Sequence, residues 1–429
     1  MRTIDFKIVI TVLTFLVMMP ILVAWAQDAI DVYEAATENS VLPGARAAGM
    51  GGAQMAAGMD GSVLWYNPGL LTRITRSELS GTLTHQKFTN ETAVSGAGIM
   101  PDANVSNTRL GSLWGTYRVP TYQGSMVIGF AVNRVKSFDR IFRYASSPTW
   151  LVDSYVSTSG WGGGEDETGS MWAWSFGGAI ELSPRASVGL SIDVFDGDDD
   201  WTFFYDSTDA AANYSYSYSH TINDDYTGVS GKIGFNYDLE SNISLAGVIG
   251  FPTSLTLDQT SEYYEYDNRN LDSYDYWTSS YRYTLPFWLG LGAQARLEDL
   301  TLAGDVSFMD YSQLQYRSGL EGLSDLNRTV KRYYDETVTF RVGAEYVIQP
   351  SGTRLRLGYY QEPAGFRGFN MESDPHFFTF GAGFLLDRSV MIDLAFLTGS
   401  WKLERDDGGV LTSEKYKANR FMLTVSYRL

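Results

Sequence analysis

Alternation of apolar and polar residues is the feature that most constrains this chain, because it recurs in about fourteen short segments. In the last segment the apolar register is Phe421, Leu423, Val425, Tyr427 and Leu429. Successive side chains of a β-strand point to opposite faces, so each segment is predicted to be a strand with one apolar face. The predicted strands lie near residues 78–86, 109–118, 124–134, 171–182, 186–195, 226–238, 243–252, 284–297, 300–311, 336–347, 353–361, 375–386, 389–400 and 419–428.

The connectors between the predicted strands alternate in length. Short ones are 120–123, 183–185, 240–242, 298–299 and 387–388, and long ones are 135–170, 196–225, 252–283 and 313–335. A soluble sandwich would bury the apolar registers in a core, whereas a membrane barrel would turn them toward lipid. Short turns on one side and long loops on the other are typical of outer-membrane barrels. We therefore predict an all-β fold, a transmembrane antiparallel β-barrel of about 14 strands with both chain ends in the periplasm.

Residues 1–26 have the form of an export signal. Arg2 and Lys7 precede a long apolar run that ends in Ala24-Trp25-Ala26, the small-x-small pattern that signal peptidase accepts. An uncleaved membrane helix is the alternative, and Pro20 within the run stands against it. No later segment reaches about eighteen continuous apolar residues, which excludes a helical membrane protein. The sequence thus predicts a cleaved signal peptide and a location in the outer membrane of a Gram-negative-type bacterium.

Charge and composition exclude several classes of function. The formal net charge of −18 disfavours a nucleic-acid partner, because phosphate binding needs clustered Lys and Arg. The chain contains no Cys, so it has neither a disulfide framework nor a thiolate metal site. Many of the acidic residues fall in the predicted connector 196–225, which lacks Lys and Arg and is typical of a solvated outer surface.

A stretch rich in Gly and Ala, residues 27–77, precedes the first predicted strand. Its distinctive residues are Arg46, Gly49, Met50, Gly51, Gly52, Ala53, Asp60, Asn67 and Pro68. Small side chains allow compact packing inside a lumen, and glycines permit a close approach to the wall or a positive φ. The Asn-Pro pair is expected to bond nearby backbone and to fix a turn, although an ordinary turn before the first strand is the alternative.

These residues resemble a stretch of the outer-membrane transporters of hydrophobic compounds and long-chain fatty acids, the FadL/TodX family. Its members show an Arg-x-x-Gly-Met-Gly-Gly-Ala-like stretch, an acidic residue soon afterwards, and Asn-Pro-Ala, where this chain has Gly69 instead of Ala. The resemblance implies an N-terminal lumen plug, or hatch, at 27–77 and a barrel at 78–429.

The same resemblance implies passive transport of hydrophobic small molecules, such as long-chain fatty acids or aromatic hydrocarbons, without a cofactor. The compounds would enter from the outer loops and leave sideways into the membrane. Other implied partners are outer-membrane lipid and the barrel-insertion machinery.

Aromatic and basic residues in the longest predicted connector, 135–170, are candidates for the first capture of such a ligand. They are Phe138, Arg140, Phe142, Arg143, Trp150 and Trp161. The rings would contact an apolar tail, and the arginines could meet a carboxylate head. Packing of a folded loop over the mouth is the alternative. Lumen-register Arg341, Arg354, Arg356 and Glu345 are expected to form internal ion pairs.

Enzyme signatures are few. The chain has three histidines and lacks the metalloprotease, nucleophile-elbow and Walker patterns. His220, near Asp224 and Asp225, leaves open an outer-loop His and Asp pair of the kind that barrel proteases use. A barrel hydrolase is therefore one alternative function, and a docking or shuttle component in protein secretion is another. We predict that the chain is not an enzyme and has no catalytic or metal site.

Overall fold

The computed structural model describes residues 40–148, 150, 159–240, 242–269, 272–366, 370–407 and 410–429. The predicted signal peptide and residues 27–39 of the predicted hatch lie outside these ranges. Within the described ranges, no helix combines the length and the apolar character needed to cross a bilayer.

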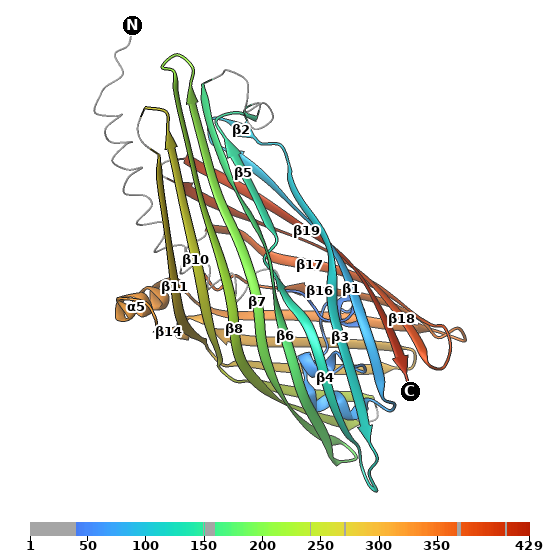
Figure 1. Ribbon diagram of the computed structural model, residues 1–429. Coiled ribbons are helices and arrows are strands. Elements are labelled where there is room, and N and C mark those ends of the chain that lie inside the picture. Colours follow the sequence, from blue (N-terminus) through green and yellow to red (C-terminus); the bar gives the residue numbers. More distant parts are fainter. Residues whose placement is uncertain are drawn as a thin grey trace.

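The strands form one antiparallel sheet that closes on itself (Figure 1). Its members are β1 (Glu78–Val94), β2 (Gly98–Ile99), β3 (Ala103–Val119), β4 (Met126–Ser137), β5 (Arg140–Ala145), β6 (Gly160–Ser183), β7 (Ala186–Asp209), β8 (Tyr214–Glu240), β9 (Ile243–Gly250), β10 (Thr253–Asp267), β11 (Ser273–Leu285), β12 (Trp288–Leu297), β13 (Leu300–Asp310), β14 (Gln315–Ser318), β15 (Glu336–Ile348), β16 (Thr353–Gln361), β17 (Asn370–Leu385), β18 (Val390–Asp407) and β19 (Val410–Arg428). The barrel closes where β1 pairs with β19, from Glu78 opposite Arg428 to Val94 opposite Thr412. Five pairs of successive strands each form one wall strand: β2 with β3, β4 with β5, β9 with β10, β11 with β12, and β13 with β14. The wall therefore has 14 strands, as predicted.

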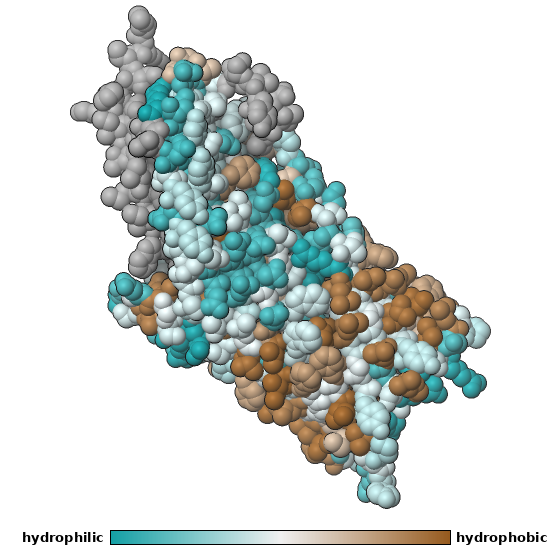
Figure 2. Space-filling view, viewed as in Figure 1, coloured by the Kyte–Doolittle hydropathy of each residue, from teal (hydrophilic) through white to brown (hydrophobic). Residues whose placement is uncertain are grey.

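The apolar registers face outwards and the polar registers face the lumen. On β19 the outward Phe421 is 47% exposed, whereas the inward Met422 is 1% exposed. Figure 2 shows apolar residues gathered over the lower half of the barrel in that view. An outward apolar band with an inward polar register is the arrangement of a membrane barrel rather than of a soluble sandwich.

Strands extend far beyond this band, where the sequence predicted long connectors. The predicted connector 196–225 consists largely of the paired ends of β7 and β8, and 252–283 of β10 and β11. The acidic residues there lie in a strand ladder, with Asp198 opposite Asp225, so the prediction of a connector was wrong. Asp196, Asp198 and Asp200 are nevertheless exposed, as expected of a solvated outer surface. Cross-strand aromatic pairs such as Phe203 and Tyr218, with ring centroids 5.7 Å apart, support these outer strands. Outside lipid such strands need no apolar outer face, and Figure 2 shows them as largely hydrophilic.

Residues 40–77, here called the lumen segment, lie inside the barrel (Figure 1). The segment contains α2 (Ala45–Gly49), α3 (Val63–Tyr66) and the 3-10 helix η1 (Pro68–Arg73). Two further helical elements, η2 (Tyr311–Gln313) and α5 (Leu323–Tyr333), lie between β13 and β15. All residues from 41 to 58 are buried, although helices this short cannot form alone. The wall therefore holds the lumen segment in place.

Candidate functional site: the lumen and an interruption of its wall

Glycines bring the lumen segment into contact with the backbone of the wall. Gly51 has φ of +63°, and a Cβ built there would lie 2.8 Å from the carbonyl oxygen of Val342. The wall matches it, because a Cβ on Gly358 would lie 2.2 Å from the nitrogen of Gly51. The predicted stretch of glycines thus lies where the lumen segment and the wall leave no room for side chains.

An ion-pair network joins Arg46 of the lumen segment to three strands. Arg46 Nη2 lies 3.3 Å from Glu345 Oε1 on β15, and Arg356 Nε on β16 lies 2.7 Å from Glu345 Oε2. Arg356 Nη1 also lies 2.7 Å from Asp393 Oδ1 on β18. The expected internal ion pairs are confirmed for Glu345 and Arg356.

Asn67 connects two parts of the lumen segment to β8. Its Nδ2 donates to the carbonyl oxygens of Met55, at 2.7 Å, and Phe235, at 3.3 Å, and its Oδ1 accepts from the Gly69 N–H at 2.9 Å. Pro68 begins η1, where its missing N–H costs nothing. A Cβ on Gly69 would lie 2.7 Å from the carbonyl oxygen of Gly234. This contact explains why Gly replaces the Ala of the motif.

Asp60 stabilises a turn within the lumen segment. Its Oδ1 accepts from the N–H of Ser62 at 3.0 Å and from the Ser62 hydroxyl at 2.5 Å. Its charge also attracts Arg46. The seven candidate residues of the predicted hatch therefore lie within one packed unit, in which they contact either the wall or one another.

A cavity of about 250 Å³ lies beside the lumen segment. Leu42, Trp65 and Tyr66 line it from the lumen segment, and Phe195 and Lys232 are among the wall residues. Lys232 Nζ lies 2.6 Å from Asp193 Oδ2 and 4.5 Å from the centroid of the Trp65 ring. The space is mixed in polarity, with paired charges next to aromatic surface.

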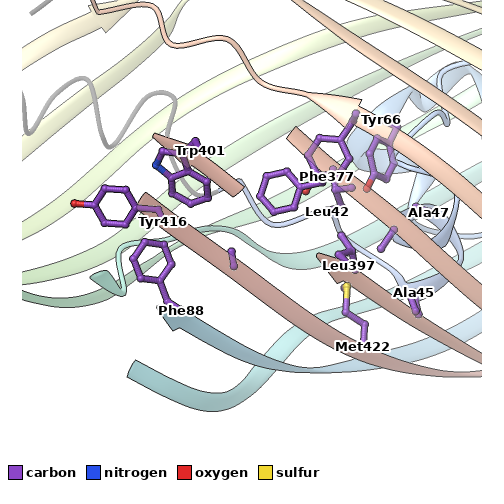
Figure 3. Packing of buried hydrophobic residues seen from close by; sticks show 14 of the residues in the cluster. Leu42, Ala45, Ala47, Tyr66, Phe88, Phe377, Leu397, Trp401, Tyr416 and Met422 are labelled. Atoms are coloured by element: carbon purple, nitrogen blue, oxygen red, sulfur yellow. The ribbon is translucent and has the colours of Figure 1, made fainter. Parts of the chain in front are cut away.

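Aromatic side chains gather beside this space, and Figure 3 shows several of them. This aromatic cluster consists of Phe88, Tyr360, Phe377, Trp401 and Tyr416. The Tyr360 and Phe377 rings stack at 4.7 Å between centroids, and Phe88 lies 5.4 Å from Tyr416. Leu42 and Tyr66 of the lumen segment belong to the same packed core. The core thus continues from the lumen segment along the inner wall.

The main-chain ladder of the wall is interrupted between β3 and β4. Their pairing runs from Val119 opposite Met126 to Ser112 opposite Asn133 and stops there. A register shift follows on β4 at residues 134–136, and β5 pairs with β6 but not with β3. Ile141 of β5 packs against the lumen-facing aromatic cluster, so this part of the chain turns inwards. Residues 103–111 of β3 are consequently paired along one edge, with β1.

Side chains bridge the interruption. Arg109 Nη2 on β3 lies 2.9 Å from Asp139 Oδ1, and Arg109 Nη1 donates to the carbonyl oxygen of Gly169 on β6 at 2.9 Å. Asn107 Nδ2 donates to Asp139 Oδ2 at 2.5 Å. Sequence reasoning missed Arg109, Asn107 and Asp139, because their positions carry no motif and lie at the ends of predicted strands or in a predicted connector.

The candidate capture residues lie in packed or paired positions of the outer part of the barrel. Phe138 stacks on Tyr226 at 5.6 Å, and Phe142 and Trp150 are also buried. Arg140 Nε lies 2.8 Å from Glu167 Oε2, and Arg143 Nη2 lies 2.6 Å from Asp166 Oδ1. Trp161 packs partly buried beside Trp150. Arg140, Phe142 and Arg143 lie in β5 and Trp161 lies in β6, so these side chains pack or pair within strands. The capture of ligand by these residues remains a prediction.

His220 is enclosed by aromatic rings and has a hydroxyl partner. Its Nε2 lies 2.6 Å from Ser261 Oγ, and its ring centroid lies 5.7 Å from those of Trp201 and Trp277. Burial lowers the pKa of His220 to about 4. The imidazole is therefore neutral near pH 7, and no hydrogen bond joins it to Asp224 or Asp225 within the described part of the chain.

Comparison with solved structures places the fold among transport barrels. A FadL homologue of Pseudomonas aeruginosa superimposes with a TM-score of 0.65 at 14% identity, covering 91% of this chain and 99% of that one. The toluene transporter TodX of Pseudomonas putida gives 0.64 at 15% identity, covering 90% and 98%. The toluene transporter TbuX of Ralstonia pickettii gives 0.57 at 12% identity, again covering 90% and 98%.

These identities establish a shared fold. No protein-family model matches the chain, and no curated protein matches it. The chain therefore has the barrel fold of FadL homologues and TodX-type channels over most of its length.

Proposed function

We propose that this protein is a passive outer-membrane channel for hydrophobic compounds such as long-chain fatty acids or aromatic hydrocarbons. Support comes from the apolar outer band, the shared fold with toluene transporters, and the motif residues of the lumen segment. In this proposal residues 27–77 form a hatch that closes the lumen to free diffusion. The short-turn end of the barrel, where the Leu429 N–H bonds the Ser77 carbonyl oxygen, faces the periplasm.

The interruption between β3 and β4 is the observation that carries the proposed sideways exit. Backbone groups in lipid need partners inside the protein, and a continuous ladder supplies them permanently. Beyond Ser112 and Asn133 the side chains of Asn107 and Arg109 supply bridging bonds instead. Side-chain rotation can break such bonds while β1 still holds β3 in place.

The position of the interruption fits delivery into the membrane. The outward side chains of β3 are apolar at Leu110 and Leu113 and become polar further out, at Thr108 and Ser106. The interruption therefore starts near the outer end of the apolar band. An apolar ligand that leaves here avoids water, which favours its path by about 25 cal/mol per Å² of apolar surface kept dry.

A covalent cross-link between the two sides of the interruption tests this proposal. The chain contains no native Cys, so Asn107→Cys with Asp139→Cys gives a clean site for a short thiol cross-linker. Uptake of a radiolabelled long-chain fatty acid, or of toluene, should fall on cross-linking and recover when a cleavable linker is reduced. Thr398→Cys with Asn419→Cys is the matched control, because these residues face each other on the continuously paired β18 and β19.

Three outcomes are distinguishable. Loss of uptake in the first pair alone supports a sideways exit at the interruption. Equal uptake in both cross-linked pairs rejects this exit. Unchanged uptake of both compounds on deletion of the whole protein rejects transport itself and favours a role in secretion or hydrolysis.

A further inference from the structure

Four lysines lie together on the outer surface of the barrel, although the formal net charge of the chain is −18. This lysine cluster consists of Lys87 on β1, Lys402 on β18, and Lys415 and Lys417 on β19, and all four side chains are exposed. The three strands are neighbours in the wall (Figure 1). Half of the lysines of the chain are therefore concentrated in one place, which indicates a local role for positive charge.

Strand register places the four lysines on one face of the sheet. Lys402 lies directly opposite Lys415, and Lys417 follows two positions later on the same side of β19. Lys87 lies opposite Asn419, the next outward residue of β19. Like charges that face each other across a sheet destabilise the pair of strands. A face that holds these charges together therefore favours an anion from outside the chain.

The described acids on this face lie at its outer edge. Glu91 lies opposite Lys415, and Glu404 lies farther out on β18. Nearer to the apolar band the lysines have neutral neighbours, because Lys417 lies opposite Thr89. The side of the lysine cluster that is closest to the membrane is thus the most positive.

The lysine cluster adjoins the apolar band of the wall. Lys417 lies four positions from Phe421, which is opposite Phe396, and both rings are exposed. At about 3.3 Å per residue along a tilted strand, the Lys417 backbone lies roughly 10 Å beyond these rings. Lys87 is nearer, since it is level with the residue two positions from Phe421. Lysine stems lie along apolar surface while the ammonium groups stay in a polar layer, so this is the level of lipid head groups.

A lipid is the molecule that can contact both surfaces at once. Its acyl chains would lie against the outward rings of Phe396 and Phe421, and its anionic head would lie among the lysines. A soluble partner could not contact the apolar band, because the membrane covers it. Lysine binds phosphate as a point charge and does not require the planar geometry of a carboxylate.

We propose that the lysine cluster is a binding site for the phosphate groups of a membrane lipid whose acyl chains cover the adjoining apolar band. In the proposed orientation of the barrel this lipid belongs to the outer leaflet. The site lies on the outer surface of the wall, so it goes beyond the proposed function and does not depend on what passes through the lumen.

Two lipids that differ in phosphate content test the inference on the purified full-length protein in nonionic detergent. Native mass spectrometry should show that diphosphoryl lipid A binds severalfold more tightly than monophosphoryl lipid A. A triple variant, Lys87→Gln with Lys415→Gln and Lys417→Gln, should bind diphosphoryl lipid A about a hundredfold more weakly, because each Lys near an anionic lipid surface contributes about fivefold.

Two further variants are the controls. Replacing the same three lysines by Arg keeps the charge and should preserve binding. A second triple variant removes equal charge from exposed residues at the short-turn end and should also bind as the wild type does: Arg185→Gln, Arg296→Gln and Arg388→Gln.

The outcomes decide between a site and a general effect of charge. Weaker binding in the Lys→Gln variant alone supports the lysine cluster as the site. Equal weakening in the Lys→Gln and short-turn variants shows that net charge governs binding and rejects the site. Equal affinity of the wild type for the two lipids rejects phosphate recognition. An unchanged unfolding temperature in detergent without added lipid shows that each variant is folded, and binding by the Lys→Arg variant excludes a merely structural role for the lysines.

Discussion

Arg46 in the lumen segment and Glu345 on β15 form a buried ion pair, with 3.3 Å between Nη2 and Oε1, that fixes the segment to the wall. Glu345 also pairs with Arg356, so a single carboxylate compensates two buried arginines. Arg356 also pairs with Asp393 on β18. Glu345 is thus one of the acidic wall residues that hold the lumen segment, together with Asp238, which pairs with Arg73, and Asp305, which accepts from the Met55 N–H.

Replacing the Glu345 carboxylate by an amide should loosen the lumen segment. Glu345→Gln keeps the shape but leaves Arg46 and Arg356 without their shared anion, and breaking a buried pair costs about 3–5 kcal/mol. We expect a lower unfolding temperature and a larger ion conductance in planar bilayers as the segment detaches. Asp325→Asn breaks an exposed pair with Arg328 on α5 and should cost less than about 1 kcal/mol. Equal effects of the two substitutions would contradict this role of Glu345.

Alanine substitutions at two glycines of similar backbone conformation can separate the effect of steric crowding on stability from that of backbone strain. Gly51 has φ of +63° and Gly352 has φ of +69°, so Ala is strained by about 1 kcal/mol at either position. At Gly352 a Cβ would meet no atom within 4 Å, whereas at Gly51 it would lie 2.8 Å from wall backbone. Gly51→Ala should therefore lower the thermal unfolding temperature well beyond Gly352→Ala. Matching unfolding curves would show that the lumen segment can move away from the wall at little cost.

Contact with membrane lipid explains which parts of the fold could be predicted from the sequence. All predicted strands occur, because the requirement for an apolar outward face forces alternation, as at Phe421 and Val425. In the outer strands, beyond the apolar band, both faces meet water or neighbouring side chains, so no apolar register is required. The sequence around Asp198 and Asp200 was therefore predicted as a connector, although these residues lie in β7. In the lumen segment the close backbone contacts select glycines, and their spacing could be recognised.

The interruption of the wall could not be found in the same way. Apolar and polar residues no longer alternate between Val132 and Val135, where the register shift of β4 occurs. Without alternation, the sequence does not indicate which side chains face the lumen or where the chain turns inwards. Asp139 meets Arg109, which is 30 positions away in the sequence, only because the chain after β4 separates from β3. Such pairs follow from the closed barrel and not from any local pattern.

The paired outer strands around His220 should become less stable in acid, because the buried imidazole resists protonation. This residue lies outside the apolar band, since the outward residues of β8 at its level, Thr221 and Asn223, are polar. Burial lowers the pKa of His220 to about 4 from an ordinary value of 6.5. Between these values the unfolded outer strands bind a proton that the folded strands exclude. The stabilisation is therefore complete above about pH 6.5 and is lost as the pH falls toward 4.

Tryptophan fluorescence and hydrogen exchange can follow this transition. Because Trp201 and Trp277 pack on the His220 ring, their emission should change as the outer strands open, and amides of 214–223 should exchange faster. His220→Gln cannot take up the proton and can still bond Ser261, so it should flatten the pH dependence while leaving residues 336–348 of β15 unaffected. If the wild type and His220→Gln lose exchange protection in parallel, a group other than His220 governs the response.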